Sequence, residues 1–489
     1  MTRLTTSQPA AVFALSQPRR RWPLWVGLLL MLAIVSLTAV YYCFVFVADR
    51  DVRQAMAEAD ASSPGGWQIQ EILAQRAQIP DDENAALFAL KVQELLPAVW
   101  PPTASDGISN PAGNKLVSVE IGELAPEVQL PADLAKSLRA LLDQVEPARA
   151  EARRLIGMTR GRYPLELEDD NWVSIRGTAN VSQAAQIAAD LLRQEAELAS
   201  QEDDPDRALA SVRGMLAAAR SVGDEPLINS ALLRLDCDAM AVATLERTLA
   251  QGAPSGPELE AAQRLLESEA HEPILTQALR GERAGLHLLM LSLRDRKASL
   301  PKVLGEGPGF GSWLLSASGP TLARRSHARV LRLMNEFVAA SELPVEQLQA
   351  EIDRIEKRVR QARNNDHDFI PVYVIPGVPM VSESYRRGVG NLRSALAAVA
   401  VERYRLDHGR WPDTLNALVP EYLAAVPTDP QDGKPLRYKR RREGIVVYWV
   451  GSDGIDDGGK FDRTAKYYTK GIDQGIQLWE AKHRRQRAP

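Results

Sequence analysis

The chain has 489 residues, of which 45% are hydrophobic and 25% are charged, and its formal net charge is −4. This composition is ordinary for globular protein and lacks the basic excess of nucleic-acid-binding proteins, so no nucleic-acid partner is expected. With only Cys43 and Cys237 present, and Cys43 inside a long apolar run, a cysteine-based zinc site is excluded and an intramolecular disulfide is not expected.

Residues 22–48 carry no charged side chain, and Arg19, Arg20 and Arg21 stand directly before them. About 20 apolar residues are enough for a helix to cross a bilayer, and basic clusters stay on its cytoplasmic side. The sequence therefore predicts a cytoplasmic basic tail at 1–21 and a single transmembrane helix at 22–48, through which the protein contacts the lipid bilayer. It predicts that the bulk of the chain lies in the periplasm, tethered to the inner (cytoplasmic) membrane of a bacterium.

A cleaved signal peptide is the alternative to this anchor. Signal peptides have an apolar region of about 7–15 residues and a cleavage site of small residues. Here the apolar run is longer and ends in the bulky residues of 41–48, which favours an uncleaved anchor. Val40, Tyr41 and Tyr42 are also too bulky for a lipoprotein site at Cys43.

The region 49–363 is predicted to be helical. Acidic residues at 81–83, within a predicted helix start at 80–84, precede a stripe of apolar residues at helical spacing (Ala85, Phe88, Ala89 and Val92), and a second stripe occupies 184–192. Helix breaks are predicted at 203–205, 223–226 and 252–257, where Asp, Gly and Pro gather. No 34-residue period is sustained, so the expected architecture is an irregular helical bundle or solenoid.

Two glycine- and proline-rich stretches in this part of the chain are predicted to be loops. The stretch 101–122 contains one candidate strand at 116–121. Gly305–Gly311 lacks the Gly-Lys-Ser/Thr ending of a phosphate-binding loop, so it is interpreted as a connector. A linker is predicted at 364–379.

The pattern changes after the linker to that of a small α+β module at 380–470. A helix over about 384–407 is predicted to end at His408–Pro412, because Gly409 suits a left-handed cap and Pro412 prevents continuation. A short helix at 413–418 follows, then strands at 436–438 and 445–450 and an Asp/Gly-rich loop at 451–459. Residues 471–489 are predicted to form a helical basic tail.

This module resembles the globular head of the major pseudopilin of type II secretion systems. The resemblance covers about residues 385–470 and rests on Tyr404–Pro412, Asp429-Pro430, Gly433–Tyr438, and Tyr448 before the acidic loop. The layout as a whole is similar to uncharacterised membrane-anchored bacterial proteins that carry such a tail. The fold class is therefore mainly α: a transmembrane helix, a helical region and a pseudopilin-head-like module.

The resemblance implies a calcium site, calcium being the one cofactor expected. The matching ligands are Asp453, Asp456, Asp457 and Asp462, and calcium takes 6–8 oxygen ligands in flexible geometry. A solvated acidic turn is the alternative. The head-like module lies about 340 residues after the anchor, and its helix carries Arg386, Arg387 and Arg393. The anchor is therefore predicted to be a fixed tether and not a polymerisation stem.

Candidates for catalysis are few. The six histidines are His271, His287, His327, His367, His408 and His483, and none is paired at metal-ligand spacing. His287 is predicted to be a buried structural residue, and Glu282 with Arg283 an internal ion pair. No catalytic motif such as GxSxG or HExxH is present.

Two basic clusters, at 440–442 and 483–487, are interpreted as lipid-headgroup contacts or as solvated residues. The predicted function is a membrane-anchored scaffold or interaction protein of the envelope, associated with secretion machinery and bound to an envelope protein partner. One alternative is a periplasmic hydrolase whose site the sequence does not reveal. Another is that the C-terminal module is purely structural and closes the helical region.

Overall fold

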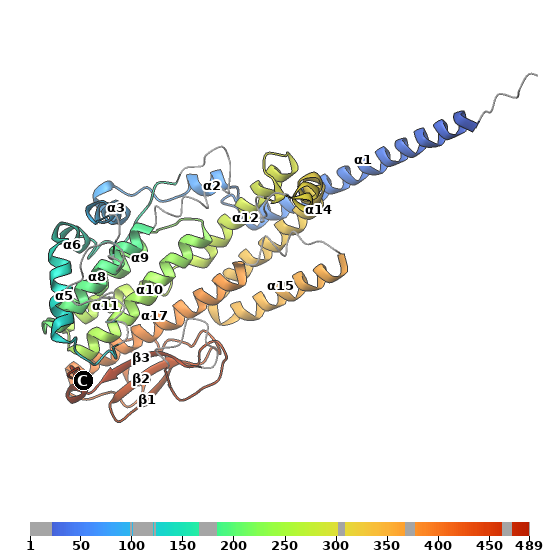
Figure 1. Ribbon diagram of the computed structural model, residues 1–489. Coiled ribbons are helices and arrows are strands. Elements are labelled where there is room, and N and C mark those ends of the chain that lie inside the picture. The colour runs from blue at the N-terminus through green and yellow to red at the C-terminus, as the bar shows by residue number, and fades with distance from the viewer. Residues whose placement is uncertain are drawn as a thin grey trace, which may run out of the picture. The chain divides into compact units, whose positions relative to one another are not determined.

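The computed structural model describes residues 22–97, 100, 121, 124–165, 183–301, 309–366, 377–461 and 472–488. The protein is mainly helical, with a small three-stranded sheet near its C-terminus (Figure 1). It forms two compact units, Met1–Gln54 and Ala55–Pro489. The mainly α class predicted from the sequence is confirmed.

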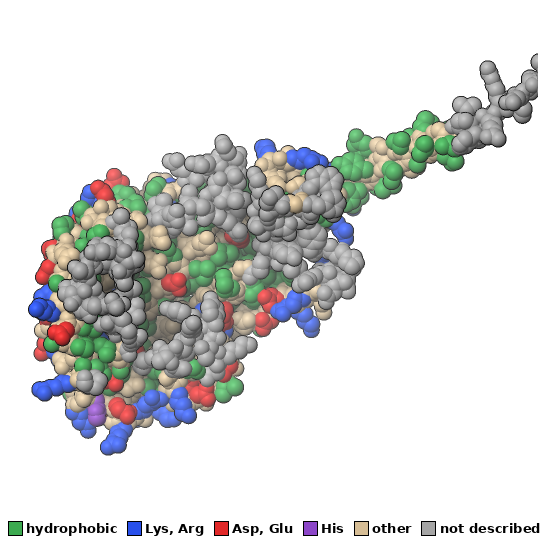
Figure 2. All heavy atoms as spheres, viewed as in Figure 1, with side chains coloured by type: hydrophobic (Ala, Val, Ile, Leu, Met, Phe, Trp, Pro, Cys, Tyr) green, Lys and Arg blue, Asp and Glu red, His purple; other side chains and the backbone are tan. Residues whose placement is uncertain are grey.

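The first unit contains most of helix α1 (Trp22–Ser62). From Trp25 onward this helix is long and apolar enough to cross a membrane. Large apolar side chains such as Leu29, Leu37 and Val40 are exposed along it, and Figure 2 shows this stretch without blue or red side chains. The predicted apolar helix at 22–48 is thus present, and it continues past the predicted end.

The second unit contains the other helices. Their bounds are α2 Ile69–Ala74, α3 Ala85–Leu95, α5 Ala132–Asp143, α6 Glu146–Arg153, α8 Gln183–Gln201, α9 Pro205–Arg220, α10 Ile228–Gln251, α11 Gly256–Glu269, α12 Ile274–Arg294, α14 Phe310–Ser341, α15 Val345–Asp366 and α17 Gly377–His408. Three short 3₁₀ turns lie at Asp81–Glu83, Leu415–Leu418 and Ala481–His483.

The predicted helix breaks at 203–205, 223–226 and 252–257 all fall at or between helix ends. Asp204 caps α9, because its side chain accepts a hydrogen bond from the Arg207 amide at 3.1 Å. The apolar stripe predicted on α3 is buried at all four positions. Local sequence chemistry therefore sets these boundaries.

Helix α17 lies between α10 and α11 on one side and strands β2 (Gly444–Trp449) and β3 (Gln474–Trp479) on the other (Figure 1). Its residues 394–402 are all buried. One hydrophobic core runs from Phe88 through Val399 to Ile476. The C-terminal α+β segment and the helical region therefore share a core.

A second core joins α12, α14 and α15 to α10 and the start of α17. Met290, Phe337 and Ile352 are among its buried residues. This cluster forms a three-helix layer beside the first core.

The sheet has the order β1-β2-β3, with β1 at Arg437–Arg440 and both pairs antiparallel. Strands β1 and β2 confirm the predicted hairpin. The prediction of a helical tail at 471–489 is wrong, because that segment contains β3. Its sequence alternates polar and apolar residues, and Ile476 and Leu478 are buried.

Helix α17 ends at His408, and Gly409 adopts the predicted left-handed conformation with φ +67°. The predicted linker at 364–379 is shorter than expected, because α15 extends to Asp366 and α17 begins at Gly377. Residues 302–308, 367–376 and most of the candidate strand at 116–121 lie outside the described residues.

Candidate functional site

The acidic loop at 451–459 follows β2 directly. Asp453 accepts a hydrogen bond from the Ile455 amide at 3.1 Å. Asp456 accepts one from the Gly458 amide at 2.9 Å and one from the Tyr448 hydroxyl at 3.0 Å. The carboxylates of Asp453 and Asp456 thus shape the turn itself, whereas the side chain of Asp457 is exposed.

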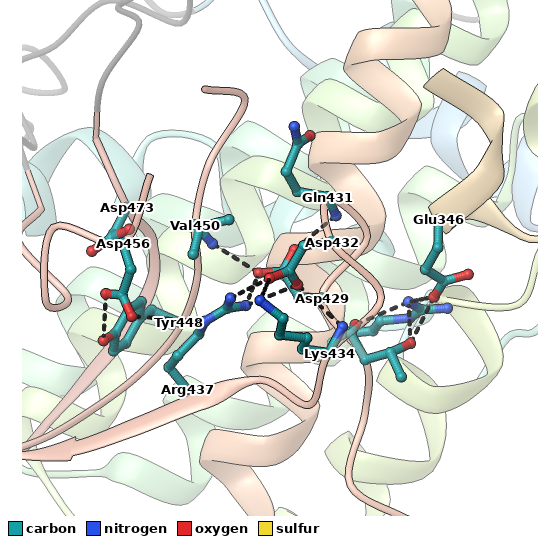
Figure 3. A network of polar contacts seen from close by, with 12 residues as sticks. Glu346, Asp429, Gln431, Asp432, Lys434, Arg437, Tyr448, Val450, Asp456 and Asp473 are labelled. Carbon is teal, nitrogen blue, oxygen red and sulfur yellow. Dashed lines mark hydrogen bonds and ion pairs between the residues drawn. The ribbon is translucent and has the colours of Figure 1, made fainter. Parts of the chain in front are cut away.

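Arg437 on β1 lies beside this loop (Figure 3). Its guanidinium pairs with Asp429 and, at 2.5 Å, with Asp432, and its Nε lies 4.0 Å from Asp456. Opposite charges at these distances attract strongly where the site is partly shielded from water. One arginine therefore pairs with two aspartates and reaches a third.

Asp429 holds the turn before β1 against the end of β2. It is fully buried and accepts hydrogen bonds from the Gln431 amide at 2.7 Å and the Val450 amide at 2.9 Å. Burial raises the pKa of this carboxyl, while the two amides and Arg437 oppose the rise. Asp429 of the Asp-Pro motif thus links the turn before β1 to the end of β2.

Asp473, which the sequence analysis did not single out, lies on the other side of the acidic loop (Figure 3). It is 1% exposed, and its Oδ2 accepts a hydrogen bond from the Gly459 amide at 2.6 Å. Its Oδ1 is buried without a hydrogen-bond partner among the described residues, and burial raises the pKa of the carboxyl. The only sequence signal was its place just before an alternating apolar run.

The predicted calcium ligands are only partly among the described residues. Among the described residues, no group of three or more His, Cys, Asp or Glu side chains is arranged to hold a metal. The guanidinium of Arg437 already occupies the space between Asp429, Asp432 and Asp456. Asp462 lies outside the described residues. A calcium site at Asp453, Asp456, Asp457 and Asp462 therefore stays a prediction.

A second ion pair ties this region to the helices. Arg393 of α17 bonds Glu346 of α15 at 2.6 Å and the Thr428 carbonyl oxygen at 3.0 Å. Hydrogen bonds from Arg393 and Thr428 lower the pKa of Glu346 against the effect of burial. The turn before β1 is therefore clamped to two helices.

The basic cluster at 483–487 is partly buried. Arg484 is buried and donates to Glu402 of α17 at 2.9 Å, to the Trp479 carbonyl at 2.9 Å and to the Gly252 carbonyl at 2.7 Å. In the other basic cluster, Arg440 bonds Asp413 at 3.1 Å. Arg484 therefore joins the C-terminal segment to α10 and α17, whereas the pair of Arg440 lies at the surface.

The densest buried charge cluster lies between α9, α10 and α11. Glu269 is bracketed by Arg220, which bonds its Oε2 at 2.5 Å, and by Arg234, which bonds its Oε1 at 2.8 Å. Asp238 beside them is 1% exposed. Burial, reinforced by the charge of Glu269, raises the pKa of Asp238 well above its ordinary value. Burial therefore favours the protonated form of this carboxyl.

His287 is buried, as predicted, and its Nδ1 lies 3.0 Å from Nε2 of His327. Burial lowers the pKa of His287 to about 4 and that of His327 to about 3, so both rings are neutral at pH 7. Arg283 bonds Ser63 and Asn335. His367 lies outside the described residues.

The chain matches none of the family models, curated proteins or solved structures with which it was compared. Its own geometry is therefore the guide to function. Many of the charged groups described above form pairs that join helices, turns and strands, an arrangement suited to holding a surface in a fixed shape.

Proposed function

We propose that the protein is a membrane-anchored scaffold or interaction protein of the bacterial envelope. The observation that carries this proposal is the apolar helix from Trp25 onward, followed in sequence by one large compact unit. Arg19, Arg20 and Arg21 before the helix favour an orientation with the N-terminus in the cytoplasm and the unit in the periplasm.

In this proposal the C-terminal segment closes the helical unit. Support comes from the shared core of α10, α11, α17 and the sheet, and from the buried pair between Glu402 and Arg484. The resemblance to a pseudopilin head supports the finer proposal that the partner belongs to a secretion apparatus. The rigid network around Arg437 would present that face to the partner.

Cysteine labelling tests the orientation. The test uses Cys43→Ser as background, in which the remaining Cys237 is fully buried. A membrane-impermeant maleimide should label Lys357→Cys, at an exposed site on α15, in intact spheroplasts. Ser16→Cys should react only after permeabilisation. The reverse pattern would refute the orientation.

Crosslinking in native membranes tests the scaffold role. The tagged full chain should enrich an envelope protein relative to a control in which residues 1–54 carry an unrelated periplasmic domain. The control has the same apolar helix, so enrichment depends on the compact unit. Equal recovery from both chains would count against the proposal.

A further inference from the structure

Two buried histidines bond each other between α12 and α14. Nδ1 of His287 lies 3.0 Å from Nε2 of His327, and the two residues are 7% and 1% exposed. One ring donates a proton to this bond and the other accepts it, which requires at least one neutral ring. Among the described residues, neither ring bonds a carboxylate. The pair therefore depends on the neutral form of histidine.

Residues 58–67, the entry segment, dock beside this pair near the start of the compact unit. Trp67 is buried, and its ring meets the ring of His287 edge to face, with the two centroids 4.9 Å apart. Arg283, one helical turn before His287, lies over the same indole at 5.6 Å and donates a hydrogen bond to Ser63 at 2.9 Å. The docking of the entry segment therefore depends on the packing around His287.

The charges around the pair do not favour an added proton. The charge of Arg294 on α12 acts against protonation of both rings. The acids of the entry segment are engaged elsewhere, because Glu58 pairs with Arg332 at 2.9 Å and Asp60 accepts a hydrogen bond from the indole of Trp67 at 2.7 Å. The other charged residues of α2, or within about two turns of either histidine, each have a contact of their own; they are Glu71, Arg280, Glu282, Arg324, Arg325 and Arg329.

Protonation disrupts this arrangement. Two protonated rings point two N–H groups at each other, and a single added proton buries a cation near Arg283 and Arg294. Burial accordingly lowers the pKa of His287 to about 4 and that of His327 to about 3, from an ordinary value of about 6.5. Because these values are lowered in the closed state, the contribution of the pair is complete above about pH 6.5 and is lost as the pH falls toward 4.

We infer that the His287–His327 pair is a proton-sensitive lock, which holds the entry segment on α12 and α14 at neutral pH and releases it in acid. The release is local, because α12 and α14 belong to the second core, whereas α8 and α9 lie in the first. The inference goes beyond the scaffold role and does not depend on the orientation of the chain in a membrane. If the chain is anchored as proposed, acid loosens the connection between the anchor and the compact unit.

Hydrogen–deuterium exchange of the full chain in detergent micelles tests this inference. Exchange is measured at pH 7.5 and at pH 5, and each rate is divided by the intrinsic chemical rate at that pH. The corrected exchange of residues 58–67 should rise about 30-fold at pH 5 for each ring that takes up a proton, given a pKa of about 6.5 when open and about 4 when closed. Residues 208–219 of α9, in the first core, should keep their protection.

A double variant removes the titration. His287→Asn with His327→Gln places side-chain amides near the positions of Nδ1 and Nε2, and neither amide titrates. Its corrected exchange at residues 58–67 should be the same at both pH values. His271→Asn with His408→Asn is the matched control, because these two histidines are exposed and contact a backbone carbonyl oxygen through Nδ1. The control should keep the wild-type response to pH.

The wild-type chain alone can overturn the inference, even if the double variant does not fold. Equal corrected exchange of residues 58–67 at both pH values would show that no lock opens. An equal rise at residues 208–219 would show that acid destabilises the whole unit, which also overturns a local lock. A response that persists in a folded double variant, or that is lost in the control, would assign it to other groups. None of these outcomes bears on the membrane orientation, which the cysteine labelling tests.

Discussion

Glu402 is the position where one substitution should most clearly reveal how the C-terminal segment stabilises the fold. This carboxylate is fully buried on α17 and accepts hydrogen bonds from Arg484 at 2.9 Å and from Arg405 at 2.7 Å. Glu402→Gln removes the negative charge and leaves Arg484 buried without a counterion. Breaking a buried pair in this way costs about 3–5 kcal/mol.

The free-energy cost of Glu402→Gln predicts a decrease in the thermal midpoint of unfolding. An unfolding entropy of about 2.1 cal/mol/K per residue, over about 430 residues, gives about 0.9 kcal/mol/K. Glu402→Gln should therefore lower the thermal midpoint of the full chain in detergent micelles by about 3–6 °C, measured by calorimetry. The shift should be present at any salt concentration, because a buried pair is little screened.

Glu260→Gln is the matched control. Glu260 pairs with Arg264 on the surface of α11, where the two side chains are 48% and 66% exposed. Such pairs contribute about 0–1 kcal/mol, so the control should shift the midpoint by about 1 °C or less. If Glu402→Gln shifts it no more than the control does, the C-terminal segment does not stabilise the core through this pair.

Three further substitutions or conditions test other parts of the structure. Burial raises the pKa of Asp238 in the native state, so native stability should fall as the pH rises above about 3.8, where the unfolded chain loses this proton; Asp238→Asn should match wild type at pH 3.5 and exceed it in urea unfolding at pH 7. Gly281→Ala should destabilise by at least about 2 kcal/mol, because a Cβ would collide with the backbone between α9 and α10, whereas Gly256→Ala meets open space and should be neutral. Calcium should raise the thermal midpoint relative to chelator, because a ligand that binds the folded state stabilises it, and Asp457→Asn should abolish the rise; midpoints within about 1 °C of each other would contradict the predicted site.

The parts of the fold that depend on neighbouring residues were predictable. The cap at Asp204, the buried stripe on α3 and the end of α17 at Gly409 each depend on residues within about one helical turn. The hairpin of β1 and β2 was equally visible, since its strands are close in sequence and rich in β-branched and aromatic residues.

The parts that depend on distant partners were not predictable. Arg484 looks like a surface arginine in a basic tail until Glu402, 82 residues earlier, is placed beside it. β3 was missed because its charged surroundings outweighed a short alternating pattern. A charged side chain is buried only where an opposite charge pairs with it. A partner that lies many residues away in the sequence leaves no local pattern.

The individual residues of the candidate site were predictable from the sequence, but their contacts were not. Asp456 and Asp457 were predicted to lie in a loop, and Asp429 and Arg437 were noted as motif residues. The contacts of Arg437 with Asp429 and Asp456 depend on the register of β1 and β2. That register sets Arg437 opposite Tyr448, whose hydroxyl bonds Asp456. This cross-strand neighbour relation places Arg437 near Asp456, one of the four predicted calcium ligands.

The position of β3 has a consequence for how the protein matures in the cell. β3 and Arg484 come after every helix that they hold in place, and Arg484 closes onto Glu402 and the end of α10. A chain synthesised only as far as residue 470 would expose the apolar edge of β2 and leave Glu402 without Arg484. Nascent and prematurely terminated chains should therefore stay open to chaperones and proteases, so that only chains carrying residues 474–484 escape degradation.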